Sequence, residues 1–175
     1  MEKKFILTAF GKDRPGIVAD IAEVIFEHQC NLEDSNMGRL ADEFTLILLL
    51  SGKGEDLADK LARESKRLER EKDIFVFIRP LEYSHPKLAN GIEYTRIEVE
   101  GIDQTGIVYK IADLLAKKQI NIETLTSKKK YSPNSGTVMY SMQIKTTLPD
   151  AMTQDSLREN LDVLANELNV DITVH

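Results

Sequence analysis

The sequence predicts an α+β protein made of two similar units, each a sheet with two helices packed on one face. Three observations support this fold class. Each half of the chain has the element order β-α-β-β-α-β. The loop Gly11 to Val18 returns as Gly101 to Val108, a shift of 101 − 11 = 90 residues. The chain has 175 residues, 42% of them hydrophobic, which is enough for two small units that pack together.

The first half contains four expected strands, three of them apolar and one, at residues 32–37, only weakly patterned. They span residues 5–10, 32–37, 43–50 and 74–78, with a turn at 38–42 and a stop at 51–54. Residues 55–72 are expected to form a helix, because leucines and alanines share one face and charges of both signs fill the other.

The repeated loop is expected to turn the chain at Gly11 and then to open a helix. Asp13 is suited to the N-cap, which places Pro15 and Gly16 in the first helical turn. The apolar face of this helix is marked by three isoleucines at helical spacing, Ile17, Ile21 and Ile25.

The second half repeats the same order of elements. Strands are expected over residues 92–100, 122–127, 137–145 and 170–174, with a polar loop at 128–136 that contains three lysines. A helix follows the second loop, and Thr153 is suited to cap a last helix. We therefore predict a first unit over residues 1–80, a linker over 81–91 and a second unit over 92–175.

The strands of the two halves differ in their pattern of apolar residues. The runs 45–50 and 74–78 are apolar at nearly every position, whereas the strands of the second half alternate. Helices cover only one face of such a sheet, so the bare face of the first unit should be covered by another subunit or by the linker. We predict a homo-oligomer that uses this face.

Composition excludes several classes of protein. A formal charge of −6 with interspersed signs argues against direct nucleic-acid binding. The single cysteine, Cys30, lies in an apolar pattern and is expected to be a buried, unreactive side chain. The sequence shows neither a leader pattern nor an apolar run long enough to cross a membrane, so a soluble cytoplasmic protein is expected.

The repeated loops have the chemistry of an amino-acid site. The amides of a first helical turn favour an anion such as a carboxylate, and Gly16 and Gly106 let a ligand approach the backbone. Asp13 and Asp103 could take an ammonium group. Asn31 and Asn121, which follow the helices at the same offset, can both donate and accept hydrogen bonds. A purely structural role also stays open, because aspartate and glycine are common at the starts of helices and asparagine is common in the left-handed conformation that ends a helix.

The loop and its surroundings resemble the ACT domain. The resemblance rests on Asp13-Arg14-Pro15-Gly16-Ile17-Val18 before the first helix and Asn31-Leu32 after it. A variant, Asp103-Gln104-Thr105-Gly106-Ile107-Val108, precedes the third helix, with Asn121-Ile122 after it. Both units together are similar to the tandem ACT proteins of the glycine cleavage system transcriptional repressor family.

The resemblance implies a ferredoxin-like fold, with antiparallel four-stranded sheets of strand order 4-1-3-2. It also implies amino-acid binding at a seam between two units. One site would combine Asp13, Arg14, Pro15, Gly16, Ile17 and Val18 with Asn121 and Ile122. The other would combine Asp103, Gln104, Thr105, Gly106, Ile107 and Val108 with Asn31 and Leu32. The second loop lacks the arginine and proline of the first, so the two sites are expected to differ.

Three functions are compatible with the sequence. The first is a non-catalytic regulator that senses an amino acid such as glycine or serine and acts on glycine cleavage genes through a DNA-binding partner. The second is an interaction module without a small ligand. The third, an enzyme, is disfavoured, because the three histidines are far apart in sequence and no metal, cofactor or phosphate-binding motif is present.

Overall fold

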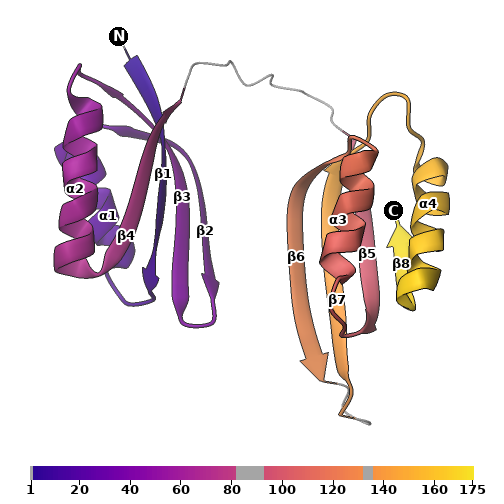
Figure 1. Ribbon diagram of the computed structural model, residues 1–175. Coiled ribbons are helices and arrows are strands. Elements are labelled where there is room, and N and C mark those ends of the chain that lie inside the picture. The colour runs from indigo at the N-terminus through magenta and orange to yellow at the C-terminus, as the bar shows by residue number, and fades with distance from the viewer. Residues whose placement is uncertain (1, 82–92, 132–135) are drawn as a thin grey trace. The chain divides into compact units, whose positions relative to one another are not determined.

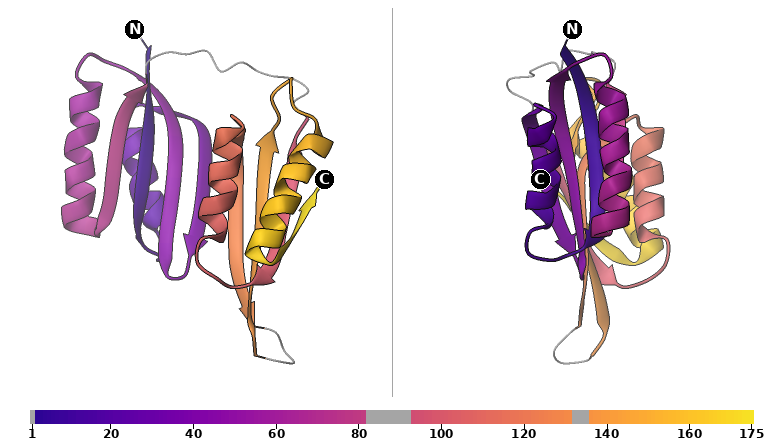
Figure 2. Two further views of the ribbon diagram at one scale, coloured as in Figure 1. Left: turned by 45° about the vertical axis from the view of Figure 1, so that its right-hand side comes forward. Right: turned by 90° about the vertical axis from the view of Figure 1, so that its left-hand side faces the viewer.

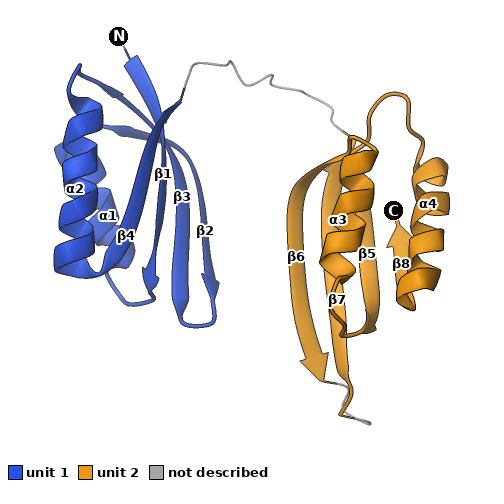
Figure 3. Cartoon of the chain, in the orientation of Figure 1, with its two compact units in different colours: residues 1–86 blue, residues 87–175 orange. Residues whose placement is uncertain are grey.

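The computed structural model describes residues 2–81, 93–131 and 136–175 (Figure 1). The chain divides into two compact units, residues 1–86 and 87–175 (Figure 3). The linker predicted over residues 81–91 lies almost wholly outside the described residues, so its extent stays a prediction.

Unit 1 is a four-stranded antiparallel sheet with two helices. Its elements in chain order are β1 (Glu2–Lys12), α1 (Ile17–Glu27), β2 (Asn31–Leu40), β3 (Glu43–Lys53), α2 (Leu57–Lys72) and β4 (Ile74–Leu81). The strand order across the sheet is β2-β3-β1-β4. Because β1 lies between β3 and β4, its two neighbours in the sheet are both far from it in sequence.

Unit 2 repeats this topology. Its elements are β5 (Thr95–Ile102), α3 (Ile107–Lys117), β6 (Asn121–Tyr131), β7 (Val138–Thr147), α4 (Gln154–Leu168) and β8 (Val170–Val174). The sheet order is β6-β7-β5-β8. The α+β fold class, the two β-α-β-β-α-β units and the strand order 4-1-3-2 are confirmed.

Each unit has its own hydrophobic core between the sheet and its two helices, which lie on the same face (Figure 2). Alternate residues of β1 point into the core of unit 1, and Phe5, Leu7 and Ala9 are fully buried there. Ile17, Ile21 and Ile25 of α1 meet them, as their spacing predicted. Cys30 packs partly buried against the same core, and burial raises the pKa of its thiol.

Most strands are longer than predicted, and three of them extend into predicted turns or loops. β2 continues to Leu40, β3 continues to Lys53, and β6 includes Lys128 to Lys130, which were expected in a loop. Every residue of β2 is exposed, so burial leaves no alternating pattern in its sequence. Pairing with β3 and β7 supplies the backbone hydrogen bonds that hold these edge strands.

Candidate functional site at the two strand-to-helix loops

Gly11 and Gly101 are strand residues, so the prediction that Gly11 turns the chain is wrong. Gly11 pairs with Ile74, and a Cβ atom there would lie 2.9 Å from the carbonyl oxygen of Asp73. At Gly101 a Cβ would lie 2.6 Å from Cγ1 of Val170. Both glycines therefore allow the last strand of their unit to begin close to the first.

The helices begin one turn later than predicted. Gly16 is the residue before α1 and has φ 90°, and Gly106 has φ 96° before α3. Asp13 is therefore not the N-cap, and Pro15 and Gly16 precede the helix. The amide of Asp13 donates instead to the carbonyl of Asp42 over 2.8 Å, which ties the loop to the β2–β3 hairpin. The left-handed backbone is what requires glycine, because a Cβ at Gly106 would meet no atom within 4 Å.

The first turns of α1 and α3 have no side-chain cap among the described residues. In contrast, the hydroxyl of Thr153 accepts from the amide of Ser156 over 3.2 Å at the start of α4, as predicted. Uncapped first-turn amides and the positive end of the helix dipole suit an anion. Both repeated loops therefore keep hydrogen-bond donors available at the same position.

Each loop aspartate pairs with a cation on the neighbouring edge strand. Nη1 of Arg39 lies 3.4 Å from Oδ2 of Asp13, and Nζ of Lys129 lies 2.6 Å from Oδ2 of Asp103. The hydrogen bond from Lys129 to Asp103 raises the pKa of that lysine. Neither cation was predicted from the sequence, although Arg39 and Lys129 are related by the same shift of 129 − 39 = 90 residues.

Arg14 and Gln104, the residues that follow these aspartates, form polar contacts within their own units. Nη2 of Arg14 lies 2.6 Å from Oδ2 of Asp20, and Nζ of Lys72 lies 3.2 Å from Oδ1 of the same carboxylate. The hydrogen bond from Arg14, with a smaller contribution from Lys72, lowers the pKa of Asp20. In unit 2 the amide of Gln104 donates to the carbonyl of Leu168.

Asn31 and Asn121 lie at the end of their sheets opposite to the loops. Asn31 pairs with Ser51, which pairs with Lys4 near the start of β1, whereas the loop follows the end of β1. The eight residue steps from Lys4 to Lys12 span about 26 Å. Asp13 and Asn31 of one unit therefore cannot hold the same amino acid.

The structural explanation of the two asparagines as left-handed helix exits is wrong. Gln29, with φ 51°, and Gln119, with φ 58°, occupy that conformation at the ends of α1 and α3. Asn31 and Asn121 are the first residues of β2 and β6, and both are exposed. The side-chain amide of Asn121 donates to Glu123 over 3.2 Å.

The remaining predicted site residues divide into buried and exposed positions. Ile17 and Ile107 are buried in the cores, so their side chains cannot reach a ligand. Pro15, Thr105, Val18, Val108 and Leu32 are exposed, and Ile122 is half-buried against the core of unit 2. The exposed apolar side chains beside the loops and at the start of β2 are suited to be covered by a ligand or a neighbouring surface.

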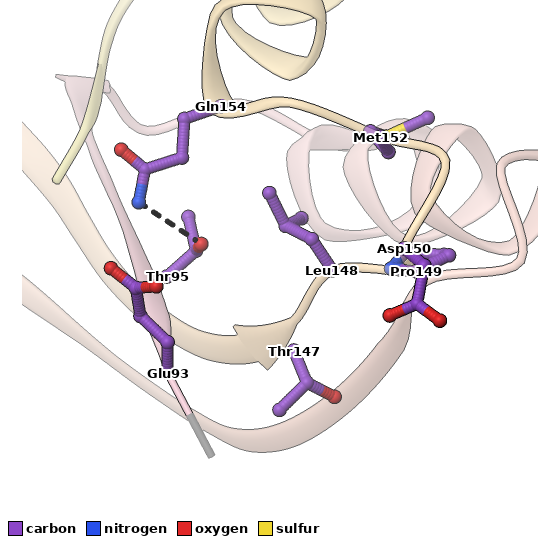
Figure 4. A pocket seen from close by; sticks show the side chains of 8 residues that line it. All are labelled: Glu93, Thr95, Thr147, Leu148, Pro149, Asp150, Met152 and Gln154. Carbon is purple, nitrogen blue, oxygen red and sulfur yellow. Dashed lines mark hydrogen bonds between the residues drawn. The ribbon is translucent and has the colours of Figure 1, made fainter. Parts of the chain in front are cut away.

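A hollow of about 480 Å³ lies in unit 2 near the end of β7 and the start of α4 (Figure 4). Gln154 donates to the hydroxyl of Thr95 over 3.4 Å on its wall, and Glu93 and Asp150 supply two carboxylates. Thr147, which also lines it, pairs with Asn121. The hollow thus adjoins one predicted asparagine but lies at the opposite end of the sheet from the second loop.

Two further features of the described part of the chain concern metals and membranes. No three or more histidine, cysteine, aspartate or glutamate side chains come together there as the ligands of a metal ion would. No helix there is both long enough and apolar enough to span a bilayer.

Comparisons with known proteins agree with the fold. Residues 3–76 match the ACT domain. The chain is 26% identical over 172 residues, 97% of its length and 88% of the relative's, to the glycine cleavage system transcriptional repressor of Escherichia coli. It is 35% identical over 75 residues to a UPF0237 protein of Methanopyrus kandleri, covering 42% of this chain and 83% of that one.

Two solved structures match the whole chain. A crystal structure described as an unknown protein from Galdieria sulphuraria has a TM-score of 0.80 and 25% identity, covering 100% of this chain and 98% of that chain. A structure provisionally described as a glycine cleavage system transcriptional repressor has a TM-score of 0.72 and 23% identity, covering 100% and 97%. At that identity the second likeness concerns the fold alone.

The fold and the repeated loops define a protein of two ferredoxin-like units that follow one another in the chain. Residues 3–76, which make up most of unit 1, match the ACT-domain family, and unit 2 repeats the topology of unit 1.

Proposed function

We propose that this protein is a non-catalytic regulator that senses an amino acid, such as glycine or serine, at its two strand-to-helix loops. The observation that carries the proposal is the recurrence, in both units, of uncapped helix amides beside an aspartate–cation pair. A free amino acid presents a carboxylate and an ammonium group together. The helix amides and the cation suit the carboxylate, and Asp13 or Asp103 suits the ammonium.

In the proposed sites, each loop is completed by the first residues of the edge strand of the other unit. Asp13 to Val18 would act with Asn121 and Ile122, and Asp103 to Val108 with Asn31 and Leu32. The exposure of Val18, Val108 and Leu32 supports this pairing, because these apolar side chains lack cover within their own unit. The distance between Asp13 and Asn31 within unit 1 also favours a site that uses both units.

The proposed output is control of transcription of glycine cleavage genes through a DNA-binding partner. The full-length relative of Escherichia coli, which is named for this activity, supports the choice of glycine cleavage genes as the target. The formal charge of −6 favours a partner that contacts the DNA in place of this chain. Ligand binding would act by favouring one arrangement of the two units, which the partner distinguishes.

A second candidate function is an interaction module that binds no small ligand. One observation favours it: Asp13 and Asp103 already have cationic partners, so the pairs could serve only to hold each loop to its hairpin. Exposed ion pairs contribute little to stability, about 0–1 kcal/mol, which leaves a purely structural role weakly supported.

Titration calorimetry with glycine and serine, followed by a thermal-shift screen of the other amino acids, tests the two functions. Asp13→Asn and Asp103→Asn should each weaken binding at one site about tenfold or more, because a charge-assisted hydrogen bond is lost. Asp113→Asn is the control, since it removes a carboxylate that is about as exposed as that of Asp13 and whose Oδ2 lies 2.8 Å from Nζ of Lys117, within α3.

If no amino acid binds or stabilises the chain, the interaction module is the better explanation. If an amino acid binds and neither loop variant changes its affinity, the ligand uses another site, and the assignment of the loops is wrong.

A further inference from the structure

The face of the unit 1 sheet that lies away from α1 and α2 is strongly apolar. We call this surface the open face of unit 1. It consists of alternate residues of the three strands β1, β3 and β4: Ile6, Thr8, Phe10, Thr45, Ile47, Leu49, Phe75 and Phe77. Phe77 is 65% exposed, Ile47 50%, Phe10 39% and Phe75 38%. The ring of Phe10 stacks on those of Phe75 and Phe77, with centroids 5.1 Å and 6.2 Å away.

The corresponding face of unit 2 is polar, although the topology and register are the same. The eight positions that pair in the same way in its sheet are Arg96, Glu98, Glu100, Ser141, Gln143, Lys145, Asp171 and Thr173. The fold therefore does not require an apolar open face. A cluster of exposed aromatic and aliphatic side chains in only one of two matched units marks an interaction surface.

The register of the strands shows that the open face of unit 1 is complementary to itself. Three rows of residues cross the sheet in the order β2, β3, β1, β4. They are Gly38, Thr45, Phe10 and Phe75; then Asn36, Ile47, Thr8 and Phe77; then Asp34, Leu49, Ile6 and Arg79. The first two rows have small side chains at the β2 edge and phenylalanines at the β4 edge.

A two-fold axis parallel to the strands would bring β2 of one copy over β4 of a second copy. Phe75 would then lie over Gly38 and Phe77 over Asn36, so large side chains would meet small ones in both halves of the interface. Aligned packing of two sheets, at about 10 Å, is one of the two common arrangements of stacked sheets. An isologous interface of this kind closes as a dimer.

The charges of the third row match in the same arrangement. Asp34 and Arg79 lie at opposite edges of the sheet, and neither forms an ion pair among the described residues. Three strand spacings, about 14 Å, separate them within one sheet, which is too far for contact. The two-fold axis would place each Asp34 opposite Arg79 of the other copy, so the dimer would contain two such pairs.

The size of the open face suits a small interface. Its three rows cross four strands and span five residues of each strand, about 19 Å by 17 Å, or roughly 320 Å² per copy in projection. The accessible area of a corrugated side-chain surface is larger than its projection, so the two copies together bury more than about 640 Å², which corresponds to the low end of specific interfaces.

We propose that two copies of this chain associate through the open faces of unit 1, with the strands aligned and Asp34 of each copy against Arg79 of the other. The proposal goes beyond the sensing function and does not depend on a ligand. The charged face of unit 2 in the same chain is a poor alternative occupant, because its carboxylates and cations would lose water against aromatic rings.

Sedimentation velocity of the full chain over a range of concentrations tests the proposal. The wild-type chain should be a dimer, and Phe77→Lys should shift it to the monomer. Each copy would then carry a second cation beside Arg79 at its β4 edge, which gives four cations in the interface of the dimer. Thr173→Lys is the matched control. Thr173 pairs with Glu98 as Phe77 pairs with Thr8, and this change in unit 2 should leave the dimer intact.

A charge exchange tests the orientation of the two sheets. Asp34→Lys and Arg79→Glu should each weaken the dimer about three- to tenfold, and the double variant should recover most of the loss. Both residues are exposed, so the variants should fold, and circular dichroism checks that they do.

Three outcomes would overturn the proposal. The first is a wild-type chain that stays monomeric at about 100 μM, where an interface of this size is expected to associate; this is also the result expected if unit 2 covers the face. The second is a dimer that Phe77→Lys leaves intact. The third is a double variant, with both charges exchanged, whose loss of dimer affinity equals the sum of the losses in the two single variants.

Discussion

Gly16 and Gly106 occupy equivalent positions in the two units, and the backbone conformation there requires glycine in both. Each adopts a left-handed backbone conformation just before a helix, with φ 90° and 96°. There is room for a side chain at both positions, since the nearest atom to a Cβ at Gly16 lies at 3.7 Å and Gly106 has none within 4 Å. The requirement for glycine is therefore conformational.

Gly16→Ala and Gly106→Ala should each lower the free energy of unfolding by about 1–2 kcal/mol, the strain of a left-handed L-residue. Urea denaturation of the two single variants measures the loss. Gly38→Ala is the control, because Gly38 has no positive φ and a Cβ there meets only Oγ1 of Thr45 at 3.6 Å. An equal loss in all three variants would show that backbone conformation is not the cause.

The candidate site could be predicted in part from single residues. Aspartate, glycine and asparagine recur at one offset, so the repeat itself singles them out in the sequence. Arg39 and Lys129 were missed because they reach the loop across a hairpin, 26 residues beyond their aspartates in sequence. A pairing of this kind depends on strand register, which local spacing does not contain.

At the scale of elements, the carboxylate of Asp20 joins three segments of unit 1. Arg14 from the loop and Lys72 at the end of α2 both contact it on α1. These contacts hold the pKa of Asp20 below its ordinary value. The charged form is therefore favoured in the folded state, and its stabilising contribution is complete above the pKa of the unfolded chain, about 4.

Asp20→Asn should consequently destabilise the chain at pH 7, and its difference from the wild type should shrink as the pH falls below about 4. Urea midpoints at neutral and acidic pH measure this difference. Asp162→Asn, an exposed position on α4 with no ion pair among the described residues, is expected to have little effect at either pH. A difference that stays constant with pH would contradict this account of Asp20.

The elements that the sequence predicted best are those with one buried side. The helices α1 and α4 and the strands β1 and β7 alternate between core and solvent, and that periodicity is visible in their residues. The extents of β2 and β6 were underestimated, because these edge strands are almost entirely exposed and are held mainly by backbone pairing. The start of α1 was misplaced because aspartate, the better N-cap by propensity, bonds to the hairpin instead.

At the scale of the whole molecule, each unit has a complete core and a complete sheet of its own. The units differ in the chemistry of their open faces, so self-association should follow one unit and not the other. A chain cut to residues 1–86 should form dimers, whereas residues 87–175 should remain monomeric at the same concentration. Sedimentation of the two fragments measures this, with circular dichroism to verify that each is folded.

Monomeric fragments from both units would mean that association needs the whole chain. Dimers formed only by residues 87–175 would place the interface in unit 2 and contradict the assignment of the apolar face.

The two open faces also bear on how the chain can change over generations. In a duplicated fold, contact with a partner can constrain the residues of one unit's face while the residues of the equivalent face in the other unit are free to change. Polar replacements at Phe10, Phe75 and Phe77 should therefore be rejected by selection, whereas Glu100, Asp171 and Thr173, at the same positions of unit 2, should accept almost any side chain that preserves the strand. The same sheet geometry would then carry two very different degrees of evolutionary freedom within one chain.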